Sequence, residues 1–221
     1  KRFTSDAAHE LRTPLTAVKL QLDLLKRADS DSERSEIESS LEAATSRSIA
    51  LVESLLSLAR SEAETLSSDL EKVNLKHAAE RVIEDLSPLA AKKKVSIGLE
   101  CDADKLHVEA RSSDIHIVIE NLLQNAITYS LENSDVRISI SSKDGRPLLD
   151  IRDEGAGIPP EERALIFDRF YRCKGNQEDG SGLGLSIAKH ILDSYGAEVA
   201  VGSGIGDKGT SFQVRFRAMD A

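Results

Sequence analysis

Glycine is distributed very unevenly along the 221 residues of this chain. The first glycine is Gly98, and eleven of the thirteen glycines lie between Gly155 and Gly209. Glycine destabilises helices and permits backbone conformations that other residues avoid, so a glycine-free front part favours long helices and a glycine-rich back part favours loops. The chain is therefore expected to form two domains of different construction.

Two amphipathic helices are predicted in the front part, because positions on one face recur at steps of four and three. In the first helix these positions are Leu11, Leu15, Val18, Leu22 and Leu25, and in the second they are Ile37, Leu41, Ala44, Ser48, Leu51, Leu55 and Leu58. A short polar break at residues 28–32, with Ser30 or Ser32 as N-cap, indicates an antiparallel hairpin. One hairpin cannot cover both stripes, so we expect two hairpins to pair in a dimeric four-helix bundle.

His9 and Glu10 lie side by side next to the apolar stripe of the first predicted helix. At about 100° per residue His9 falls on the flank of the stripe, where a second domain or a solute could reach its ring. Pro14 follows and is expected to bend the helix. Taken alone, the pair is better explained by a surface histidine without a function.

Composition limits the possible partners. The formal net charge of −9 argues against a nucleic-acid-binding surface, which needs clustered Lys and Arg. Cys101 and Cys173 lie far apart without metal-ligand spacing and are expected to be free thiols. No apolar run has the length of a membrane span, and the start without Met suggests a piece of a longer protein.

The back part is predicted to be a mixed layer of helices on one face of a largely antiparallel sheet. Helical periodicity is found near residues 76–91, 113–129 and 183–195. Alternation typical of strands is found near residues 95–100, 136–141, 148–152, 198–202 and 210–217.

Two glycine clusters indicate a binding site. Asp153, Gly155 and Gly157 directly follow a predicted strand, so a carboxylate is placed beside backbone that can pass close to a ligand. The segment 180–185 precedes a predicted helix and could cradle a phosphate at the helix N-terminus. Either cluster alone is also compatible with an ordinary turn, and neither has the spacing of a P-loop or a Rossmann motif.

Asn121 and Asn125 are four residues apart and share one face of a predicted helix. Amide oxygens suit Mg²⁺, which retains most of its water ligands and uses few protein ligands. Two helical asparagines can also simply face solvent.

Six segments in this order resemble the characteristic boxes of the two-component sensor histidine kinases. They are the phosphoacceptor box at residues 9–14, the asparagine box at 121–129, the first glycine box at 153–158, the phenylalanine box at 167–172, the second glycine box at 180–185 and the closing pair Gly209-Thr210. The resemblance covers essentially the whole chain.

The resemblance implies an α+β protein. Residues 1–67 would form the dimerisation and histidine phosphotransfer domain, residues 68–75 a linker, and residues 76–221 a catalytic ATP-binding domain. This second domain would be a Bergerat-type α/β sandwich with a mixed, largely antiparallel sheet.

The resemblance also implies ATP and Mg²⁺ as ligands. Asp153 would accept the adenine amino group, Tyr129 would pack on adenine, and Asn125 would bind Mg²⁺ with help from Asn121. The other nucleotide-binding residues would be Gly155, Gly157, Ile158, Gly180, Gly182, Leu183, Gly184 and Thr210. Residues 159–181 would form a lid, with Arg172 reaching the γ-phosphate.

In the chemistry that the resemblance implies, His9 attacks the γ-phosphate, Glu10 acts as base or orienter, and Thr13 serves a reverse phosphatase reaction. The phosphoryl group would pass to an aspartate on the receiver domain of a response regulator. Residues 1–67 would make a homodimer. The chain would be the cytoplasmic portion of an inner-membrane protein, connected to the membrane only through segments outside this sequence.

One position departs from the family pattern. Thr128 stands where the family usually has Lys or Arg, and Arg172 or Lys174 could compensate. Two alternatives stay open: a Bergerat-type ATPase in which ATP closes a dimer without phosphorylating histidine, and a signalling module that binds a regulator without kinase activity.

Overall fold

The computed structural model describes residues 15–28, 30–63, 70–102, 106–173 and 182–218. It divides the chain into two compact units, of which the first is Lys1–Ala63 with Asp179–Ser181 and the second contains the remaining residues. His9, Glu10, Thr13, Pro14, Lys174 and Gly180 lie outside the described residues.

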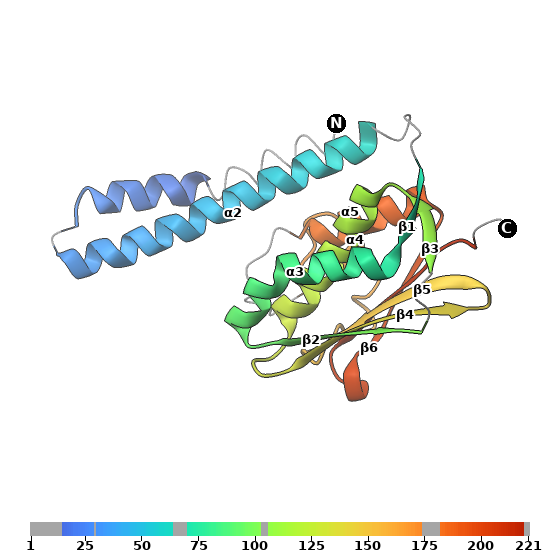
Figure 1. The fold of residues 1–221 in the computed structure, drawn as a ribbon. Helices are drawn as coiled ribbons and strands as arrows, with labels where there is room; N and C mark the ends of the chain where they lie inside the picture. The colour runs from blue at the N-terminus through green and yellow to red at the C-terminus, as the bar shows by residue number, and fades with distance from the viewer. Residues whose placement is uncertain (1–14, 29, 64–69, 103–105, 174–181, 219–221) are drawn as a thin grey trace. The chain divides into compact units, whose positions relative to one another are not determined.

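The first unit is a helical hairpin. Residues 15–25 are helical and are followed by a turn and by the long helix α2 (Asp31–Ala63). The two helices run side by side in opposite directions (Figure 1). Ser30 is the N-cap of α2, since its Oγ accepts a hydrogen bond from the Glu33 backbone N–H at 3.2 Å. The predicted hairpin and this predicted cap are both present.

The stripes of the hairpin are only partly covered within one chain. Ile37 and Ala44 of α2 are buried, but Leu15 and Leu22 of the first helix are 56% and 43% exposed. The single hairpin thus leaves apolar surface that the predicted dimer would cover.

The second unit is an α/β sandwich built on a five-stranded sheet with the order β2-β4-β5-β7-β6. The strands are β2 (Ser96–Cys101), β4 (Asp135–Lys143), β5 (Arg146–Arg152), β6 (Glu198–Ser203) and β7 (Thr210–Arg215). β2 and β4 are parallel, and the other neighbouring pairs are antiparallel. The predicted fold class is confirmed.

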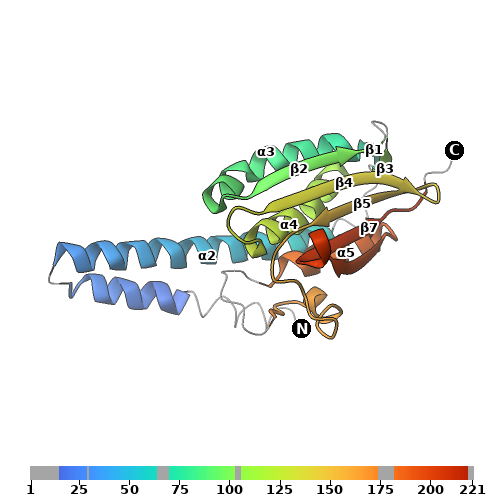
Figure 2. The same cartoon turned by 90° about the horizontal axis from the view of Figure 1, so that it is seen from below.

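Three helices, α3 (Leu75–Lys93), α4 (Ser112–Tyr129) and α5 (Gly184–Ser194), cover one face of this sheet (Figures 1 and 2). α4 lies in the middle, since it packs against both α3 and α5. Its apolar positions follow steps of three and four and are fully buried: Ile115, Val118, Ile119, Leu122, Leu123, Ala126 and Ile127. Polar side chains of α4 that remain accessible must therefore lie on the narrow face of the helix that these apolar positions do not occupy.

Two short strands were not predicted. β1 (Glu71–Asn74) and β3 (His107–Ala110) form a separate antiparallel pair, and β1 falls within the segment assigned to the linker. Each strand has four residues, which is too short for alternation to be distinctive.

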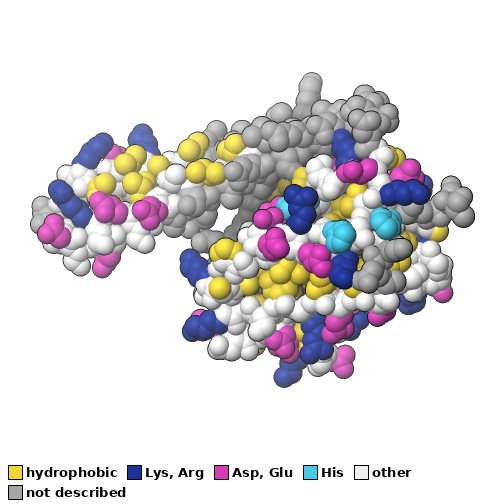
Figure 3. Space-filling model, viewed as in Figure 1, with side chains coloured by type: hydrophobic (Ala, Val, Ile, Leu, Met, Phe, Trp, Pro, Cys, Tyr) yellow, Lys and Arg dark blue, Asp and Glu magenta, His cyan; other side chains and the backbone are white. Residues whose placement is uncertain are grey.

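On the face shown in Figure 3, acidic, basic and histidine side chains of the second unit are interspersed with apolar ones. None of the helices in the described part of the chain combines the length and the apolar character needed to cross a membrane.

Candidate functional site

Asp153 follows the last residue of β5 and is a buried carboxylate, with 2% of its surface exposed. Its Oδ1 accepts hydrogen bonds from the backbone N–H groups of Gly155 at 2.8 Å and Thr210 at 3.0 Å. Burial raises the pKa of Asp153, while the hydrogen bonds from Gly155 and Thr210 act in the opposite direction. The carboxylate is therefore fixed in orientation and able to accept a further hydrogen bond from a ligand.

The first glycine cluster connects β5 to the end of α4. A Cβ on Gly155 would lie 2.2 Å from the Tyr129 carbonyl oxygen, so only glycine allows this approach. Gly157 lies against Gly209, whose neighbour Thr210 is also buried. The first glycine box, the closing pair and the end of the asparagine box thus meet around Asp153.

Asn121 of α4 lies against Gly184 at the N-terminus of α5. Asn121 Nδ2 donates a hydrogen bond to the Ile117 carbonyl oxygen at 2.8 Å, which turns Oδ1 toward Gly184. A Cβ on Gly184 would lie 2.5 Å from this oxygen. Asn125 follows one turn later and is half-buried. Amide oxygens are suitable ligands for Mg²⁺. The neighbouring helix N-terminus, with its backbone N–H groups, is suited to bind phosphate.

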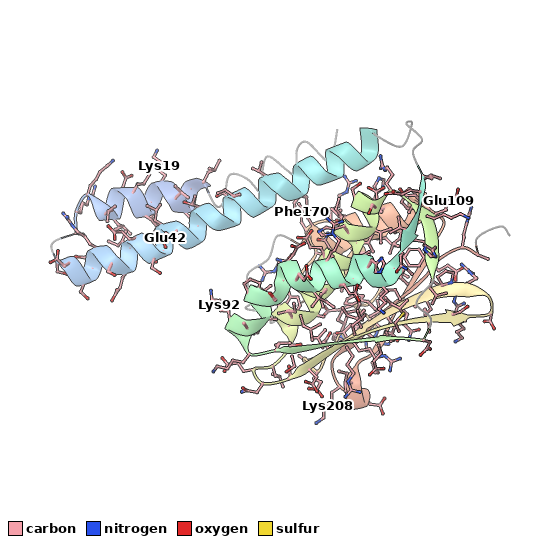
Figure 4. All side chains as sticks on the ribbon, viewed as in Figure 1. Lys19, Glu42, Lys92, Glu109, Phe170 and Lys208 are labelled. Carbon is pink, nitrogen blue, oxygen red and sulfur yellow. The ribbon has the colours of Figure 1, made fainter. Side chains whose placement is uncertain are left out.

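Phe170, within the predicted lid segment, is joined by a backbone hydrogen bond to Gly182, the residue that follows this segment. The Phe170 backbone N–H donates to the Gly182 carbonyl oxygen at 2.9 Å (Phe170 is labelled in Figure 4). Both residues have positive φ, +64° for Phe170 and +69° for Gly182, and the left-handed conformation is unusual for a bulky side chain. Nothing in the sequence pattern predicted this conformation of Phe170.

The remaining predicted residues are placed around these contacts. Leu183 is fully buried at the start of α5, Tyr129 and Ile158 are half-buried, and Arg172 is exposed two residues after Phe170. The structure thus brings together Asp153, Gly155, Thr210 and Tyr129, and separately Asn121 with Gly184.

Sequence reasoning missed two polar contacts of α4. Lys93 Nζ donates a hydrogen bond to the Thr128 carbonyl oxygen, so a cation from α3 lies at the end of α4 beside the position that lacks the family's basic residue. At the opposite end of α4, Asp114 binds Arg111 and Tyr195. Lys93 and Thr128 are 35 residues apart, and Asp114 and Tyr195 are 81 residues apart, so local sequence patterns could not pair them.

A surface hollow of about 530 Å³ lies elsewhere on the unit. It is lined by Arg163, Ala164, Phe167, Asp168, Lys189, Val199 and Val201, and includes none of the predicted nucleotide-binding residues. The convergence of the glycine clusters, and not this hollow, therefore defines the candidate site.

Comparison with known families agrees with this geometry. Residues 110–219 match the "Histidine kinase-, DNA gyrase B-, and HSP90-like ATPase" family, and residues 1–64 match the "His Kinase A (phospho-acceptor) domain". The first match contains every predicted nucleotide-binding residue, and the second contains His9.

Individual relatives point the same way. The swarming motility regulation sensor protein RssA of Serratia marcescens is 38% identical over 96% of this chain and 45% of its own length. The chain spans about half the length of the curated relatives it matches.

Solved structures share the fold. Full-length ShkA in complex with AMPPNP has a TM-score of 0.70 and 27% identity, covering 100% of this chain and 46% of that one. The histidine kinase ThkA in complex with the response regulator protein TrrA has a TM-score of 0.76 and 22% identity, covering 99% and 62%. A phosphoacceptor helical hairpin followed by an ATPase sandwich, together with these relatives, shows that the chain belongs to the two-component sensor histidine kinases.

Proposed function

We propose that this chain binds Mg-ATP in its second unit and transfers the γ-phosphoryl group to His9 of the first. The observation that carries the proposal is the buried Asp153 carboxylate, held by the backbone N–H groups of Gly155 and Thr210. An oriented acceptor of this kind matches the amino group of adenine, which is a hydrogen-bond donor.

The remaining ligand contacts follow from the elements around Asp153. Tyr129 packs on the base, and Gly182, Leu183 and Gly184 present the N-terminus of α5 to the phosphates. Asn125 and Asn121 supply oxygen ligands to Mg²⁺, which neutralises phosphate charge. Gly155, Gly157, Ile158 and Thr210 shape the base pocket, and Gly180 and Arg172 complete the phosphate side.

The reaction is an in-line phosphoryl transfer. A nitrogen of the neutral His9 ring forms a bond to the γ-phosphorus as the bond to the ADP oxygen breaks, and ADP leaves. Glu10 orients the ring and takes up its proton. The phosphoryl group then moves to an aspartate of a response-regulator receiver domain, and Thr13 orients water for the reverse dephosphorylation.

Two observations support the proposed partners. ThkA, whose fold this chain shares, is in complex with a response regulator protein, and ShkA is in complex with AMPPNP. The exposed Leu15 and Leu22 of the first helix support a homodimer through residues 1–67.

The proposal is tested by incubating the protein with radiolabelled Mg-ATP. We expect acid-labile, base-stable label on the protein, loss of that label in His9→Gln, and retained nucleotide binding in the same variant. His77→Gln is the matched control, because His77 is exposed and matches no acceptor box.

Label that survives His9→Gln contradicts the assignment of the acceptor. ATP hydrolysis without any labelled protein would instead favour a Bergerat-type ATPase, and accelerated dephosphorylation of a regulator without labelling would favour a regulator-binding module.

A further inference from the structure

We propose that Tyr195 and Asp114 form a clamp that positions the asparagine-bearing face of α4 against the N-terminus of α5. The Tyr195 hydroxyl donates a hydrogen bond to Asp114 Oδ2 at 2.5 Å. The Asp114 side chain is only 7% exposed, in the first turn of α4, and Tyr195 directly follows the last residue of α5. We name this contact, together with Arg111, the α4–α5 clamp.

Arg111 completes the clamp from the residue before α4. Its Nε and Nη2 lie 3.0 Å and 2.9 Å from the same Asp114 oxygen, and its backbone N–H donates to the Tyr195 hydroxyl oxygen at 3.2 Å. The hydroxyl therefore donates one hydrogen bond and accepts another. Hydrogen bonds to charged groups are stronger than neutral ones, and a partner lost from a half-buried site is costly.

The clamp and the candidate site share one face of α4. Asp114, Asn121 and Asn125 are separated by seven and four residues, so at about 100° per residue they point to the same side of the helix. That side faces α5, because Asn121 lies against Gly184 at one end of α5 and Asp114 binds Tyr195 at the other. The two helices are thus antiparallel and joined at two points.

The two points are coupled by the rigidity of α5. Its eleven residues separate Gly184 from Tyr195 by about 16 Å at 1.5 Å per residue. The gap at Gly184 leaves no space even for a methyl group beside Asn121. A small rotation or slide of α5 released at Tyr195 would therefore alter the spacing between Gly184 and Asn121.

This inference rests on the proposed function, in which α5 presents phosphate-binding N–H groups and α4 presents the Mg²⁺ ligands. Both must be held in register for one ligand, and catalytic groups are sensitive to displacements of an ångström or less. Arg111, Asp114 and Tyr195 touch no nucleotide in this scheme and are positioning residues.

The test replaces Tyr195 by phenylalanine, which keeps the ring and removes only the hydroxyl. We expect Mg-ATP affinity, measured by titration calorimetry, to fall roughly five-fold or more. In the nucleotide-free protein we expect the Asn121 side-chain amide resonance to shift. Val95→Ala is the control, because Val95 is buried before β2, at the opposite edge of the sheet from β6, and should lower Tm with unchanged affinity.

A double variant with Asp114→Asn should lose no more affinity than the larger of the two single losses, since both changes open the same clamp. A lower Tm for Tyr195→Phe with unchanged affinity and an unchanged Asn121 resonance would overturn the proposal. If Tyr195→Phe does not fold, Arg111→Lys provides the same readouts in a milder form. If the wild-type protein does not bind Mg-ATP, the proposed function fails, while the Asn121 resonance still decides on the clamp.

Discussion

Asp153 and Thr210 are 57 residues apart in the chain, yet the Thr210 backbone N–H donates a hydrogen bond to the Asp153 carboxylate at 3.0 Å. The Asp153 backbone N–H in turn donates to the Thr210 carbonyl oxygen at 2.9 Å. This reciprocal pair extends the β5–β7 pairing by one step beyond the end of β5. The sheet itself therefore holds the carboxylate that the proposed function assigns to adenine.

Asp153→Asn should abolish the preference for adenine nucleotides. The amide keeps one oxygen for the Gly155 and Thr210 N–H groups, but its NH₂ presents a donor to the adenine amino group. Losing that bond in a buried site costs about 1–3 kcal/mol, so Mg-ATP affinity should fall by about one to two orders of magnitude. Asp144→Asn, in the exposed turn between β4 and β5, is the control and should bind normally. Equal affinities in the two variants would contradict the role of Asp153.

The raised pKa of Asp153 predicts a pH dependence of binding. In the ionised carboxylate both oxygens are acceptors, so Oδ1 can accept from Gly155 and Thr210 while Oδ2 accepts from adenine. Protonation turns one oxygen into a donor, and burial raises the pKa above the ordinary value of 3.8. Mg-ATP affinity should therefore fall on acidification at a higher pH than an ordinary aspartate would cause. Calorimetric titrations at successive pH values, with Asp153→Asn as the reference, measure this difference.

The same shift has a defined sign for stability. A carboxyl whose pKa is raised by folding destabilises the folded state above that pKa, and the penalty disappears below the ordinary pKa of the unfolded chain. Acidification through this window should therefore stabilise wild-type protein relative to Asp153→Asn. Denaturant unfolding of the nucleotide-free proteins tests it, and an opposite trend would show that the hydrogen bonds outweigh burial.

Local patterns predicted the elements that carry the site, because burial imposes a period on the sequence. The buried positions of α4 and a serine cap of α2 could both be predicted from neighbouring residues, although the structure was needed to choose Ser30 over Ser32. The Asp114–Tyr195 contact could not, since its partners are 81 residues apart and periodicity within each helix does not say which residue of another helix lies opposite. Phe170 has a left-handed backbone that its residue type disfavours, so tertiary contact with Gly182 overrides local preference there.

Gly184→Ala should impair Mg-ATP binding without preventing folding. The new methyl group would lie 2.5 Å from Asn121 Oδ1, so either the amide or the start of α5 must move. Alanine otherwise suits a helix, and the expected signature is weaker binding with little change in Tm. Gly98→Ala is the matched control, since a Cβ there meets nothing within 4 Å. Normal affinity in Gly184→Ala would indicate that the phosphates do not approach this position.

Cys173 should react slowly with alkylating reagents at neutral pH. Burial, and next the neighbouring Glu162 carboxylate, raise the pKa of the Cys173 thiol to about 11, and only the thiolate is nucleophilic. In a Cys101→Ser background, the iodoacetamide rate followed by mass spectrometry should keep increasing up to strongly alkaline pH. Glu162→Gln removes the negative charge and should shift this profile toward lower pH. A plateau near pH 8 would contradict the proposed environment of the thiol.

Leu22→Glu should convert the predicted dimer into monomers. Leu22 belongs to the apolar stripe of the first helix and is 43% exposed within one hairpin, so a partner hairpin is expected to cover it. Burying one leucine contributes about 1.5–3 kcal/mol, and two-fold symmetry places the change twice in each dimer. Light scattering after size-exclusion chromatography would show the mass fall by half at micromolar concentration. Leu131→Glu is the control, because this leucine is 65% exposed in the other unit and its replacement should leave the mass unchanged. If Leu22→Glu remains dimeric and Leu131→Glu dissociates, the association surface lies in the second unit and the four-helix bundle is wrong.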